Sequence, residues 1–451
     1  MSRKLLLEKA HIDGIRSFDV YRREGGYRSV EKALKTMTPD QVTDEVKKSG
    51  LRGRGGAGFP TGMKWSFLAK PVGVARYLVC NADESEPGTF KDRYLMEFIP
   101  HLLIEGMITS SFALGSNVSY IYIRGEYAWI VGILEQAIAE AKLNGFLGKN
   151  ILGTGFDCEI YVHRGAGAYI CGEETALLES LEGKRGNPRI KPPFPAVKGL
   201  YDCPTVVNNV ETLAAVVPII NDGGEEYAKI GVGKSTGTKL MSACGNIKKP
   251  GVYEIDMTIS VEEFIYSDEY CGGIANEKKL KACIPGGSSV PILPANLLLT
   301  TAKGDKRLMN YESLSDGGFA TGSMMGSGGF IVLDEDQCVV RHTYTLARFY
   351  RHESCGQCSP CREGTGWMEK ILLNIENGKG KLSDIDLLWD IQRKIEGNTI
   401  CPLGDAAAWP VAAAIRHFRD EFEWHVNNPG ECLKANYGLA HYADRTSVGV
   451  V

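Results

Sequence analysis

Short apolar runs and helically spaced apolar residues alternate along the first half of the chain. Three such runs, Arg76–Asn81, Ser119–Arg124 and Cys158–His163, are each followed by polar or glycine-rich sequence. A short apolar run bounded by polar residues is typical of a buried parallel strand. Helical spacing predicts helices over Tyr127–Leu143 and Glu173–Leu181. Strands that alternate with helices predict an α/β sheet whose sites lie at the carboxyl ends of its strands.

The segments around these elements complete the first half. One or two short helices are expected over Val30–Lys48, where Thr38 can cap a helix that has Pro39 in its first turn. The five prolines of Gly186–Pro204 predict an ordered, extended loop. A helical pattern then resumes over Thr205–Pro218.

The second half changes character twice. Short β-like runs at Gly251–Glu254 and Gly329–Val332 flank glycine pairs, which predicts a small α+β module. From Val340 to Phe422 apolar residues recur at helical intervals, with breaks at 378–380 and 397, and this predicts a small helical bundle. The last twenty residues are polar and are expected to be extended.

Composition and charge exclude several classes of protein. The 451 residues include 51 basic and 55 acidic side chains, a net charge of −4, which argues against a nucleic-acid binder. No apolar run approaches the roughly 18 residues that a membrane helix needs. The apolar stretch at the N-terminus is too short for a signal peptide. We therefore expect a soluble, intracellular protein that docks on a larger assembly.

The spacing of four cysteines gives the strongest chemical signal. Cys355, Cys358 and Cys361 form a C-x-x-C-x-x-C motif, and Cys401 follows at a distance, directly before a proline. Three closely spaced thiolates with one distant thiolate are typical of a 4Fe-4S cluster. Structural zinc is the alternative, but it normally uses two cysteine pairs, and disulfides are disfavoured in a reducing compartment. The other nine of the 13 cysteines are expected to be buried small side chains.

A glycine-rich segment between residues 50 and 65 is the first candidate cofactor loop. Gly53, Gly55 and Gly58 formally satisfy G-x-G-x-x-G, but the segment follows a helix-like stretch, so an ordinary dinucleotide-binding turn is doubtful. Bare amides beside Arg54 and Lys64 are instead suited to bind phosphate. The alternative is a flexible surface loop, which the accompanying aromatic residues disfavour; these are Phe59, Trp65 and Phe67.

Two further loops follow predicted strands. Arg164–Thr175 is rich in glycine and ends in the adjacent carboxylates Glu173 and Glu174, which could serve a ligand or simply cap a helix. Asn81–Gly88 is polar and acidic, and the alternative interpretation of this segment is a solvated turn. Three such loops favour one shared site over three unrelated turns.

Other motifs fail on inspection. Gly231–Thr236 ends like a phosphate-binding P-loop, but Ala228 stands where the first glycine is required. No G-x-S-x-G nucleophile motif occurs, and the eight histidines show no pair at metal-binding spacing.

Taken together, these motifs resemble a known family. The three loops, the proline-rich Lys191–Pro195 and the four cysteines resemble the NADH-binding flavoprotein subunit of respiratory complex I, which is the F-type subunit in bacteria and the 51 kDa subunit in mitochondria. The resemblance covers Tyr27 to Trp424. Ser359 stands where threonine is frequent in that family, a difference that leaves the cysteines untouched.

The resemblance implies a multidomain α/β fold. Residues 1–236 would form a Rossmann-like domain for FMN and NADH with an N-terminal extension, and residues 237–332 a ubiquitin-like (SLBB) α+β domain. Residues 333–430 would form a four-helix domain that carries the 4Fe-4S cluster, and residues 431–451 a C-terminal tail.

The resemblance also implies site residues. The FMN contacts would be Gly53, Arg54, Gly55, Gly56, Lys64, Asn81, Asp83, Glu84, Tyr169, Gly172, Glu173, Val207, Asn208, Asn209 and Thr212. The NADH contacts would be Phe59, Phe67, Glu86, Glu174, Lys191 and Phe194, with the phenylalanines holding the adenine. Cys355, Cys358, Cys361 and Cys401 would bind the cluster. Hydride transfer requires no protein base, so no residue is assigned that role. Glu86 and Glu174 are the catalytic candidates only in the sense that they would position the nicotinamide.

The implied activity is NADH oxidation by hydride transfer to FMN, with electrons passed singly to the cluster and through partner subunits to quinone. The implied partners are a thioredoxin-like 2Fe-2S subunit and a large multi-cluster subunit, with no nucleic acid and only indirect membrane contact. The implied location is the cytoplasmic face of a bacterial membrane, or the matrix side in mitochondria. Two alternatives stay open: the diaphorase subunit of a soluble NAD-linked hydrogenase or formate dehydrogenase, and a non-enzymatic subunit braced by the cluster.

Overall fold

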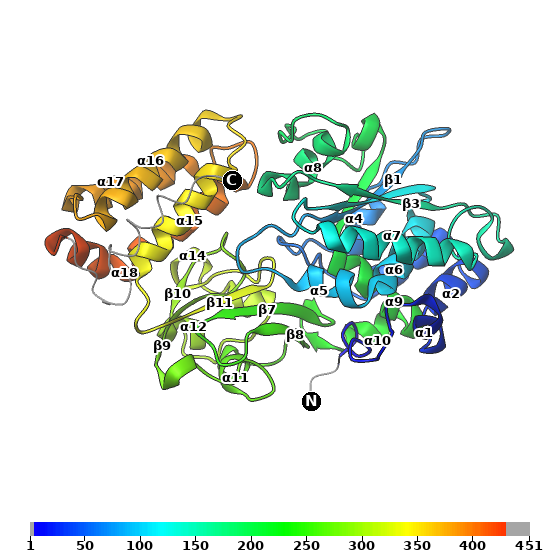
Figure 1. The fold of residues 1–451 in the computed structure, drawn as a ribbon, viewed down its shortest axis with the longest axis horizontal. Helices are drawn as coiled ribbons and strands as arrows, with labels where there is room; N and C mark the ends of the chain where they lie inside the picture. The colour runs from blue at the N-terminus through cyan, green and yellow to red at the C-terminus, as the bar shows by residue number, and fades with distance from the viewer. Residues whose placement is uncertain (1–3, 430–451) are drawn as a thin grey trace.

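The computed structural model describes residues 4–429, which fall into three spatial regions (Figure 1). An α/β region holds the first half of the chain, a second sheet with short helices lies beside it, and a bundle of long helices forms the third region. Within residues 4–429, no helix combines the length and apolar character needed to cross a membrane. The expected C-terminal tail, 431–451, lies outside the described residues.

The first region is built on a four-stranded parallel sheet with the strand order β3-β2-β1-β4. Its strands are β1 (Tyr77–Ala82), β2 (Val118–Ile123), β3 (Glu159–Arg164) and β4 (Thr205–Asn209). The three strands predicted from apolar runs are therefore confirmed to within one residue at each end. The chain leaves β1 toward β2 on one side, while β4 pairs on the other side. Ligands bind at such a reversal in open α/β sheets, beside the carboxyl ends of the strands.

The fourth strand corrects one prediction. Thr205–Pro218 had a helical pattern, but Thr205–Asn209 forms β4 and the helix starts only at Val210. The β-branched pair Val206 and Val207 fits a buried strand, and Asn209 then caps the helix by accepting a hydrogen bond from the Glu211 amide. A strand of five residues that runs directly into a helix is too short to show the alternation of apolar and polar residues by which a strand is recognised in sequence.

Helices cover this sheet and form the N-terminal part of the chain. They are α1 (Phe18–Arg23), α2 (Arg28–Thr36), α3 (Pro39–Lys48), α4 (Thr61–Ser66), α5 (Lys91–Phe98), α6 (Pro100–Leu114), α7 (Ala128–Leu143), α8 (Glu174–Leu181), α9 (Val210–Asp222) and α10 (Gly224–Ala228), with short 3-10 turns at Ile151–Gly153, Tyr169–Gly172 and Leu200–Asp202. The predicted cap of α3 is confirmed: the Thr38 hydroxyl accepts from the Gln41 amide, and Pro39 opens the helix. Helices α6 and α9 approach so closely that a Cβ at Gly106 would lie 2.1 Å from the Leu213 carbonyl oxygen.

The second region contains a five-stranded mixed sheet with the order β10-β9-β11-β7-β8. Its elements are β7 (Lys239–Gly245), β8 (Gly251–Ile255), β9 (Leu280–Ile284), β10 (Leu293–Pro294), β11 (Gly329–Asp334), α11 (Val261–Tyr266), α12 (Ala295–Leu299), α13 (Tyr311–Leu314), α14 (Gly318–Thr321) and the 3-10 turn Ala275–Glu277; the hairpin β5 (Gly231–Val232) and β6 (Ser235–Thr236) precedes them. The segment that ends like a P-loop is this hairpin. Strand β11 runs two residues past the expected boundary at 332, and the domain limits remain predictions.

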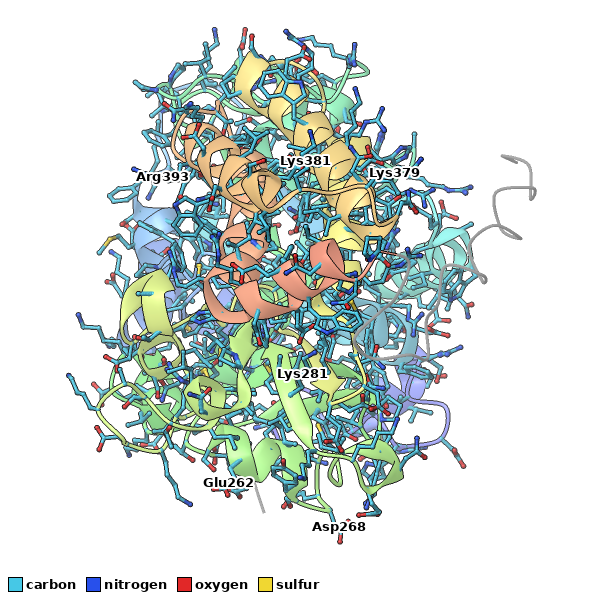
Figure 2. The ribbon with its side chains drawn as sticks, turned by 90° about the vertical axis from the view of Figure 1, so that its left-hand side faces the viewer. Glu262, Asp268, Lys281, Lys379, Lys381 and Arg393 are labelled. Carbon is cyan, nitrogen blue, oxygen red and sulfur yellow. The ribbon has the colours of Figure 1, made fainter. Side chains whose placement is uncertain are left out.

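The third region is a helical bundle, as the apolar spacing predicted, and it has the four helices that the resemblance implied. Its helices are α15 (Val339–Glu353), α16 (Ser359–Glu376), α17 (Leu382–Ile395) and α18 (Leu403–Asn427), with the predicted breaks between them. Met368, Leu372 and Ile375 of α16 are fully buried in its core. Lys281 on β9, labelled in Figure 2, ties the bundle to the second sheet. Its ammonium forms an ion pair with Glu421 on α18.

Candidate functional site

A cavity of about 530 Å³ opens where the carboxyl ends of β1 and β4 meet the bundle. A volume of this size is in the usual range for a small-molecule or cofactor site. Its walls include ten predicted site residues, namely Gly55, Gly56, Asn81, Asp83, Glu84, Glu86, Tyr169, Gly172, Glu173 and Asn209. The three loops of the sequence analysis therefore share one site. A larger cavity of about 930 Å³, beside residues 4–9, contains none of the predicted residues.

Two asparagines hold the sheet end of the cavity in shape. The Asn81 amide donates to the Gly172 carbonyl over 2.8 Å, and its oxygen accepts from the Asp83 amide. The Asn209 amide donates to Asp92 over 2.6 Å. Asn81 and Asn209 are register partners on neighbouring strands, so their positions at the cavity follow from the pairing of β1 and β4.

The acidic loop places two buried carboxyl groups against the cavity. Burial raises the pKa of Asp83 to about 7, and its Oδ2 atom has no hydrogen-bond partner among the described residues. Burial and the neighbouring Asp92 raise the pKa of Glu84 to about 7. Glu84 also accepts from the amides of Asp92 and Arg93, at the start of α5. An unpartnered, buried carboxyl oxygen that lines a cavity indicates a ligand with a complementary polar group.

Glu86 lies deeper, against the second sheet region. Its Oε1 atom accepts from the Ser289 amide over 2.8 Å and from the Ser289 hydroxyl. Burial raises the pKa of Glu86, and these hydrogen bonds oppose that change. A Cβ at Gly287 would lie 2.6 Å from the Glu86 carboxylate, so glycine at 287 leaves room for it.

The first glycine loop reaches the cavity with its backbone only. A Cβ at Gly55 would lie 2.9 Å from the Asn209 side chain, so Gly55 allows the loop to approach the end of β4. The predicted phosphate contact Arg54 points elsewhere. Its guanidinium is fully buried and donates to the Thr236 carbonyl over 2.7 Å, and its backbone amide donates to the Thr212 hydroxyl. Arg54 therefore does not line the cavity.

Four other predicted FMN contacts also lie behind the cavity wall. The Gly53 carbonyl accepts from the Tyr311 hydroxyl, Asn208 accepts from the Trp65 indole over 2.8 Å, and Val207 is buried in the core. Thr212, which accepts from the Arg54 amide, is fully buried too. These residues support the loops around the cavity, and none is among its lining side chains.

A chain of ion pairs links the glycine-rich segments. Lys191 contacts Glu173 at 3.0 Å and Glu174 at 2.9 Å, and Lys64 contacts Glu174 at 2.9 Å. Burial alone would raise the pKa of Glu174, but Lys64 and Lys191 outweigh it and lower the pKa to about 2. Glu173 also caps α8 by accepting from the Thr175 and Ala176 amides, so the capping role weighed above is correct for this residue.

The three predicted phenylalanines lie on the surface. Phe59 and Phe67 are 47% and 58% exposed, with ring centroids 6.3 Å apart, and Phe194 is 58% exposed. Flat, exposed rings are suited to stacking on a base.

The four predicted cluster cysteines gather at one end of the bundle. Cys355 and Cys358 lie in the turn between α15 and α16, Cys361 lies in the first turn of α16, and Cys401 precedes α18. Burial raises the pKa of Cys401 to about 12, and the nearby Cys355 and Cys361 add to that shift.

The sulfur spacing separates a cluster from a single zinc ion. Within residues 4–429, no three of these four sulfurs lie within 4.8 Å of one another, whereas four thiolates on one tetrahedral zinc lie about 3.8 Å apart. Thiolates that each bind a different iron of a cube lie farther apart, so the arrangement favours 4Fe-4S.

The cavity and the cysteines share a wall. Pro402 and Leu403, directly after Cys401, line the same cavity as Gly55. The Tyr169 amide donates to Glu353 at the end of α15 over 2.8 Å, which joins the second glycine loop to the bundle.

Sequence reasoning missed a group of buried charges beside the cavity. Lys91 contacts Asp92 and Glu211, each at 2.8 Å, and Lys239 contacts Glu211 at 2.8 Å, with all these side chains buried. Lys91 and Asp92 line the cavity itself. Lys91 follows the acidic loop directly and was available as a candidate, but Lys239 and Glu211 join it only through the packing of β7 against α9.

Comparison with known proteins identifies the family. The Nuo51 FMN-binding domain model matches residues 46–218, and the model of the NADH-ubiquinone oxidoreductase-F iron-sulfur binding region matches residues 341–425. The chain is 50% identical over 426 residues to an F-type subunit (F 2) of the NADH-quinone oxidoreductase of Rhizobium meliloti, which covers 94% of this chain and 98% of that protein. The chain belongs to the family of F-type subunits of NADH-quinone oxidoreductase. A second member, from Rickettsia typhi, is 53% identical over 400 residues, with 88% and 92% covered.

Solved structures extend the similarity beyond this family. A chain of an NAD+-reducing NiFe-hydrogenase, crystallised in the H2-reduced state, matches with a TM-score of 0.80 and 33% identity. The match covers 94% of this chain and 67% of the hydrogenase chain. The predicted fold class, with its Rossmann-like FMN region and helical iron-sulfur region, is thereby confirmed.

The residues present fit both groups that the family implies. The FMN-binding match contains all three loops, and their cavity offers backbone of Gly55 and Gly56, the cation Lys91 and the unpartnered Asp83 oxygen to a flat, phosphate-bearing ligand. The iron-sulfur match contains all four cysteines, which are the ligands that 4Fe-4S clusters take.

Proposed function

We propose that this chain is the NADH-oxidising subunit of a multi-subunit NADH-quinone oxidoreductase. The observation that carries the proposal is the shared wall: one cavity is lined both by Gly55 and Glu173 of the glycine loops and by Leu403, two residues after Cys401. A two-electron acceptor in that cavity would lie beside a one-electron acceptor on the cysteines. Such a neighbour relationship is what the conversion of a hydride into single electrons requires.

The bound groups supply the electron chemistry and the chain positions them. When bound, FMN accepts a hydride and releases electrons singly, and a 4Fe-4S cluster accepts them one at a time. Gly55 and Gly56 bring backbone close to the flavin site, and Asn81 and Asp83 offer polar atoms at the strand ends. Leu403 and other apolar residues of the bundle exclude water from the side that faces the cysteines.

The NADH contacts are proposed along the rim. Lys64 and Lys191, held by Glu174, offer positive charge to a pyrophosphate, and the exposed rings of Phe59 and Phe67 offer faces to the adenine. Glu86 faces the cavity and is the proposed residue that positions the nicotinamide. Glu174 is committed to the two lysines, so its proposed role is to orient them.

Partner subunits are proposed from the position of the cysteines. Trp367 on α16 is 53% exposed, and Ile400 beside Cys401 is 39% exposed, so apolar side chains face solvent near the expected cluster. This surface suits an iron-sulfur partner, proposed as a thioredoxin-like 2Fe-2S subunit or a large multi-cluster subunit. The proposed location is the inner face of a membrane, with contact through such partners.

The hydrogenase-type alternative is the weaker of the two. The F-type relatives are 50% and 53% identical over nearly their full length, whereas the hydrogenase match is 33% identical over 67% of that chain. A diaphorase feeding a hydrogenase would use the same NADH and flavin chemistry. The two differ in the partner that accepts the electrons, so co-purification of the native complex distinguishes them.

The decisive experiment is a cofactor analysis of protein purified without air, before and after NADH is added. We expect about one FMN and about four irons with matching sulfide per chain, and NADH should bleach the flavin bands and reduce ferricyanide. Protein that is folded and contains the cluster, yet holds no flavin and shows no NADH-dependent reduction, would contradict the proposal and support the non-enzymatic alternative.

A further inference from the structure

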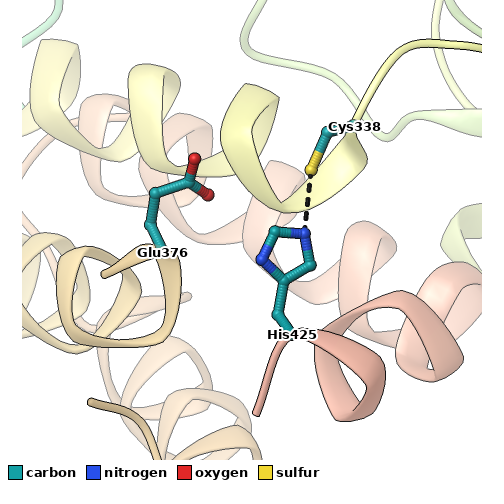
Figure 3. Close-up of side chains that lie close together, drawn as sticks. All are labelled: Cys338, Glu376 and His425. Carbon is teal, nitrogen blue, oxygen red and sulfur yellow. Dashed lines mark hydrogen bonds between the residues drawn. The ribbon is translucent and has the colours of Figure 1, made fainter. Parts of the chain in front are cut away.

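Three metal-binding side chains meet at the end of the bundle remote from the cluster cysteines. Cys338, Glu376 and His425 each offer one ligand atom, and these atoms all lie within 4.8 Å of one another (Figure 3). The Cys338 sulfur lies 3.2 Å from Nε2 of His425. All three residues are buried, at 3%, 7% and 3% exposure respectively.

The three residues come together because each lies at one end of a helix of the bundle. Cys338 caps the start of α15, Glu376 is the last residue of α16, and His425 lies in the last turn of α18. The other ends of the same three helices carry the cluster cysteines. Along α16, which is continuous from Cys361 to Glu376, fifteen residues at a helix rise of 1.5 Å each give a separation of about 22 Å. The two groups of ligands are therefore distinct sites at opposite ends.

We propose that Cys338, Glu376 and His425 bind a divalent zinc ion. A thiolate, an imidazole and a carboxylate are all zinc ligands in proteins, and where the protein supplies three ligands a water molecule takes the fourth tetrahedral position. Ligand atoms around one tetrahedral zinc lie about 3.4–3.6 Å apart. The Cys338–His425 separation of 3.2 Å is already close to that value, and a carboxylate oxygen of Glu376 lies within 4.8 Å of both ligand atoms.

Two neighbouring side chains, Arg341 and Glu421, hold the elements that carry these ligands in place. Arg341, on the same face of α15 as Cys338, contacts Glu376 at 3.3 Å and orients its carboxylate, as outer partners of metal ligands commonly do. Glu421 lies one turn before His425 on α18 and accepts from the Val339 amide, next to Cys338. Binding of zinc displaces the thiol proton of Cys338 to solvent, so the ion exchanges for a proton and no electron moves.

A catalytic role for the same residues does not hold. A thiol beside an imidazole and a carboxylate has the composition of a nucleophilic triad. A nucleophile must reach a substrate, however, and the exposures of 3%, 7% and 3% leave no access to one. A structural ion needs no such access, and it would pin three helices together at the end that the 4Fe-4S cluster does not reach.

The first test measures zinc in the complete protein, purified without air and with its cluster intact. We expect about one zinc per chain besides the iron, falling below about 0.1 in Cys338→Ser and in His425→Gln. Matched controls are Cys271→Ser, a buried cysteine of the second region, and His417→Gln, a histidine two turns earlier on α18. Both controls should keep their zinc. Zinc absent from the unmodified protein, or retained in both test variants, overturns the proposal.

A second measurement covers the case in which the variants do not fold. X-ray absorption at the zinc edge of the unmodified protein should show one sulfur at about 2.3 Å with nitrogen and oxygen ligands at about 2.0–2.2 Å. Four sulfur neighbours would mean that zinc occupies Cys355, Cys358, Cys361 and Cys401, and would overturn the proposal. Because iron, sulfide and FMN are measured in the same samples, failure of the zinc site is distinguishable from failure of the proposed function.

Discussion

Glu211 on α9 and Lys239 on β7 form an ion pair of 2.8 Å in which both side chains are fully buried. The pair joins the first sheet region to the second. Lys91 contacts the same carboxylate at 2.8 Å, and the Arg54 guanidinium lies 4.0 Å from it. Burial lowers the pKa of Lys239 to about 7, although Glu211 opposes that shift. One carboxylate thus compensates several buried cations beside the cofactor cavity.

Glu211→Gln is therefore expected to destabilise the protein strongly. Removing one partner of a buried ion pair leaves its cations uncompensated, which typically costs about 3–5 kcal/mol. Urea unfolding of the wild type and the variant measures the difference. Asp390→Asn is the control, since Asp390 and Lys394 form an exposed pair and its loss should cost within about 1 kcal/mol. Equal stability of the two variants would show that Glu211 is not needed to balance the buried cations.

Substitution of Gly55 and of its neighbour Gly56 tests whether the first glycine loop must pack closely against the end of β4. A Cβ at Gly55 would lie 2.9 Å from Asn209, whereas a Cβ at Gly56 would meet nothing within 4 Å in the protein. Gly55→Ala should therefore lower the free energy of unfolding by about 1–3 kcal/mol through overpacking, and Gly56→Ala should change it far less. Unfolding of flavin-free protein is the measurement. An equal effect of both substitutions would mean that the loop can move away from β4 at no cost.

Asp83 should make the stability of the protein depend on pH. Burial raises the pKa of its carboxyl to about 7, so the folded protein keeps a proton that the unfolded chain loses near pH 4. The folded state therefore loses stability as the pH rises from about 4 to about 7, and Asp83→Asn should remove this part of the slope. Urea unfolding at pH 5.5 and 7.5 compares the two, with the exposed Asp44→Asn as a control. A slope that is unchanged in Asp83→Asn would rule out Asp83 as its source.

Glu174→Gln should weaken NADH binding without abolishing hydride transfer. Its carboxylate holds Lys64 and Lys191, and without that charge the two ammonium groups repel each other. We expect the KM for NADH to rise about tenfold, which corresponds to about 1.4 kcal/mol, with a smaller change in kcat. Steady-state NADH–ferricyanide kinetics provide both constants, and Asp202→Asn, at an exposed pair with Lys198, is the control.

The pH dependence of that effect is itself diagnostic. Because the lysines lower the pKa of Glu174 to about 2, its charge is constant from pH 6 to pH 8. The ratio of KM values for variant and wild type should then be the same at both pH values. If this ratio fell to one at either pH, so that variant and wild type had the same KM there, another titrating group would have to position the lysines.

The sequence predicted those parts of the fold that repeat a pattern over many residues. Strands at Arg76–Asn81 and Ser119–Arg124, the capped helix after Thr38 and the helices of the bundle all have a clear period or a cap. The strand at Thr205–Asn209 was missed because five residues before a helix carry no period of their own. Local patterns thus missed β4, whose assignment depends on its pairing with β1, and they also gave no prediction for α5, α6, β7 and β9.

In the candidate site, too, the sequence predicted the local features and missed the contacts between distant residues. The loops at Gly55 and Asp83 were identified because glycines and acidic residues follow or precede regular elements in the sequence. Arg54 was assigned to phosphate from its place among glycines, yet its guanidinium turns toward Thr236, a partner 182 residues away. The Cys338–His425 contact was likewise beyond reach, because the two residues are 87 positions apart. Which way a side chain points depends on packing between distant elements.

Substitution of Cys401 tests the two proposed electron acceptors separately, because it should affect the iron-sulfur cluster and not the flavin. It is the one cluster candidate that comes from outside the Cys355–Cys361 turn, and it immediately precedes Pro402 and Leu403 of the cavity wall. Cys401→Ser replaces a soft thiolate with a poor iron ligand while the three loops of the flavin site stay intact. We expect the iron content and the NADH-induced cluster signal in electron paramagnetic resonance to fall, with FMN retained.

The same variant should still react with NADH. Because the NADH and flavin contacts proposed here lie on the loops and not on the cysteines, NADH should bleach the flavin of Cys401→Ser and support ferricyanide reduction, while reduction of quinone by the assembled complex is lost. Cys203→Ser, which changes a part-buried cysteine of the proline-rich loop, should keep both activities. Full iron content with an unaltered cluster signal in Cys401→Ser would show that the fourth ligand is another residue. Loss of quinone reduction alone, with flavin chemistry preserved, would place Cys401 between the hydride acceptor and the rest of the electron path.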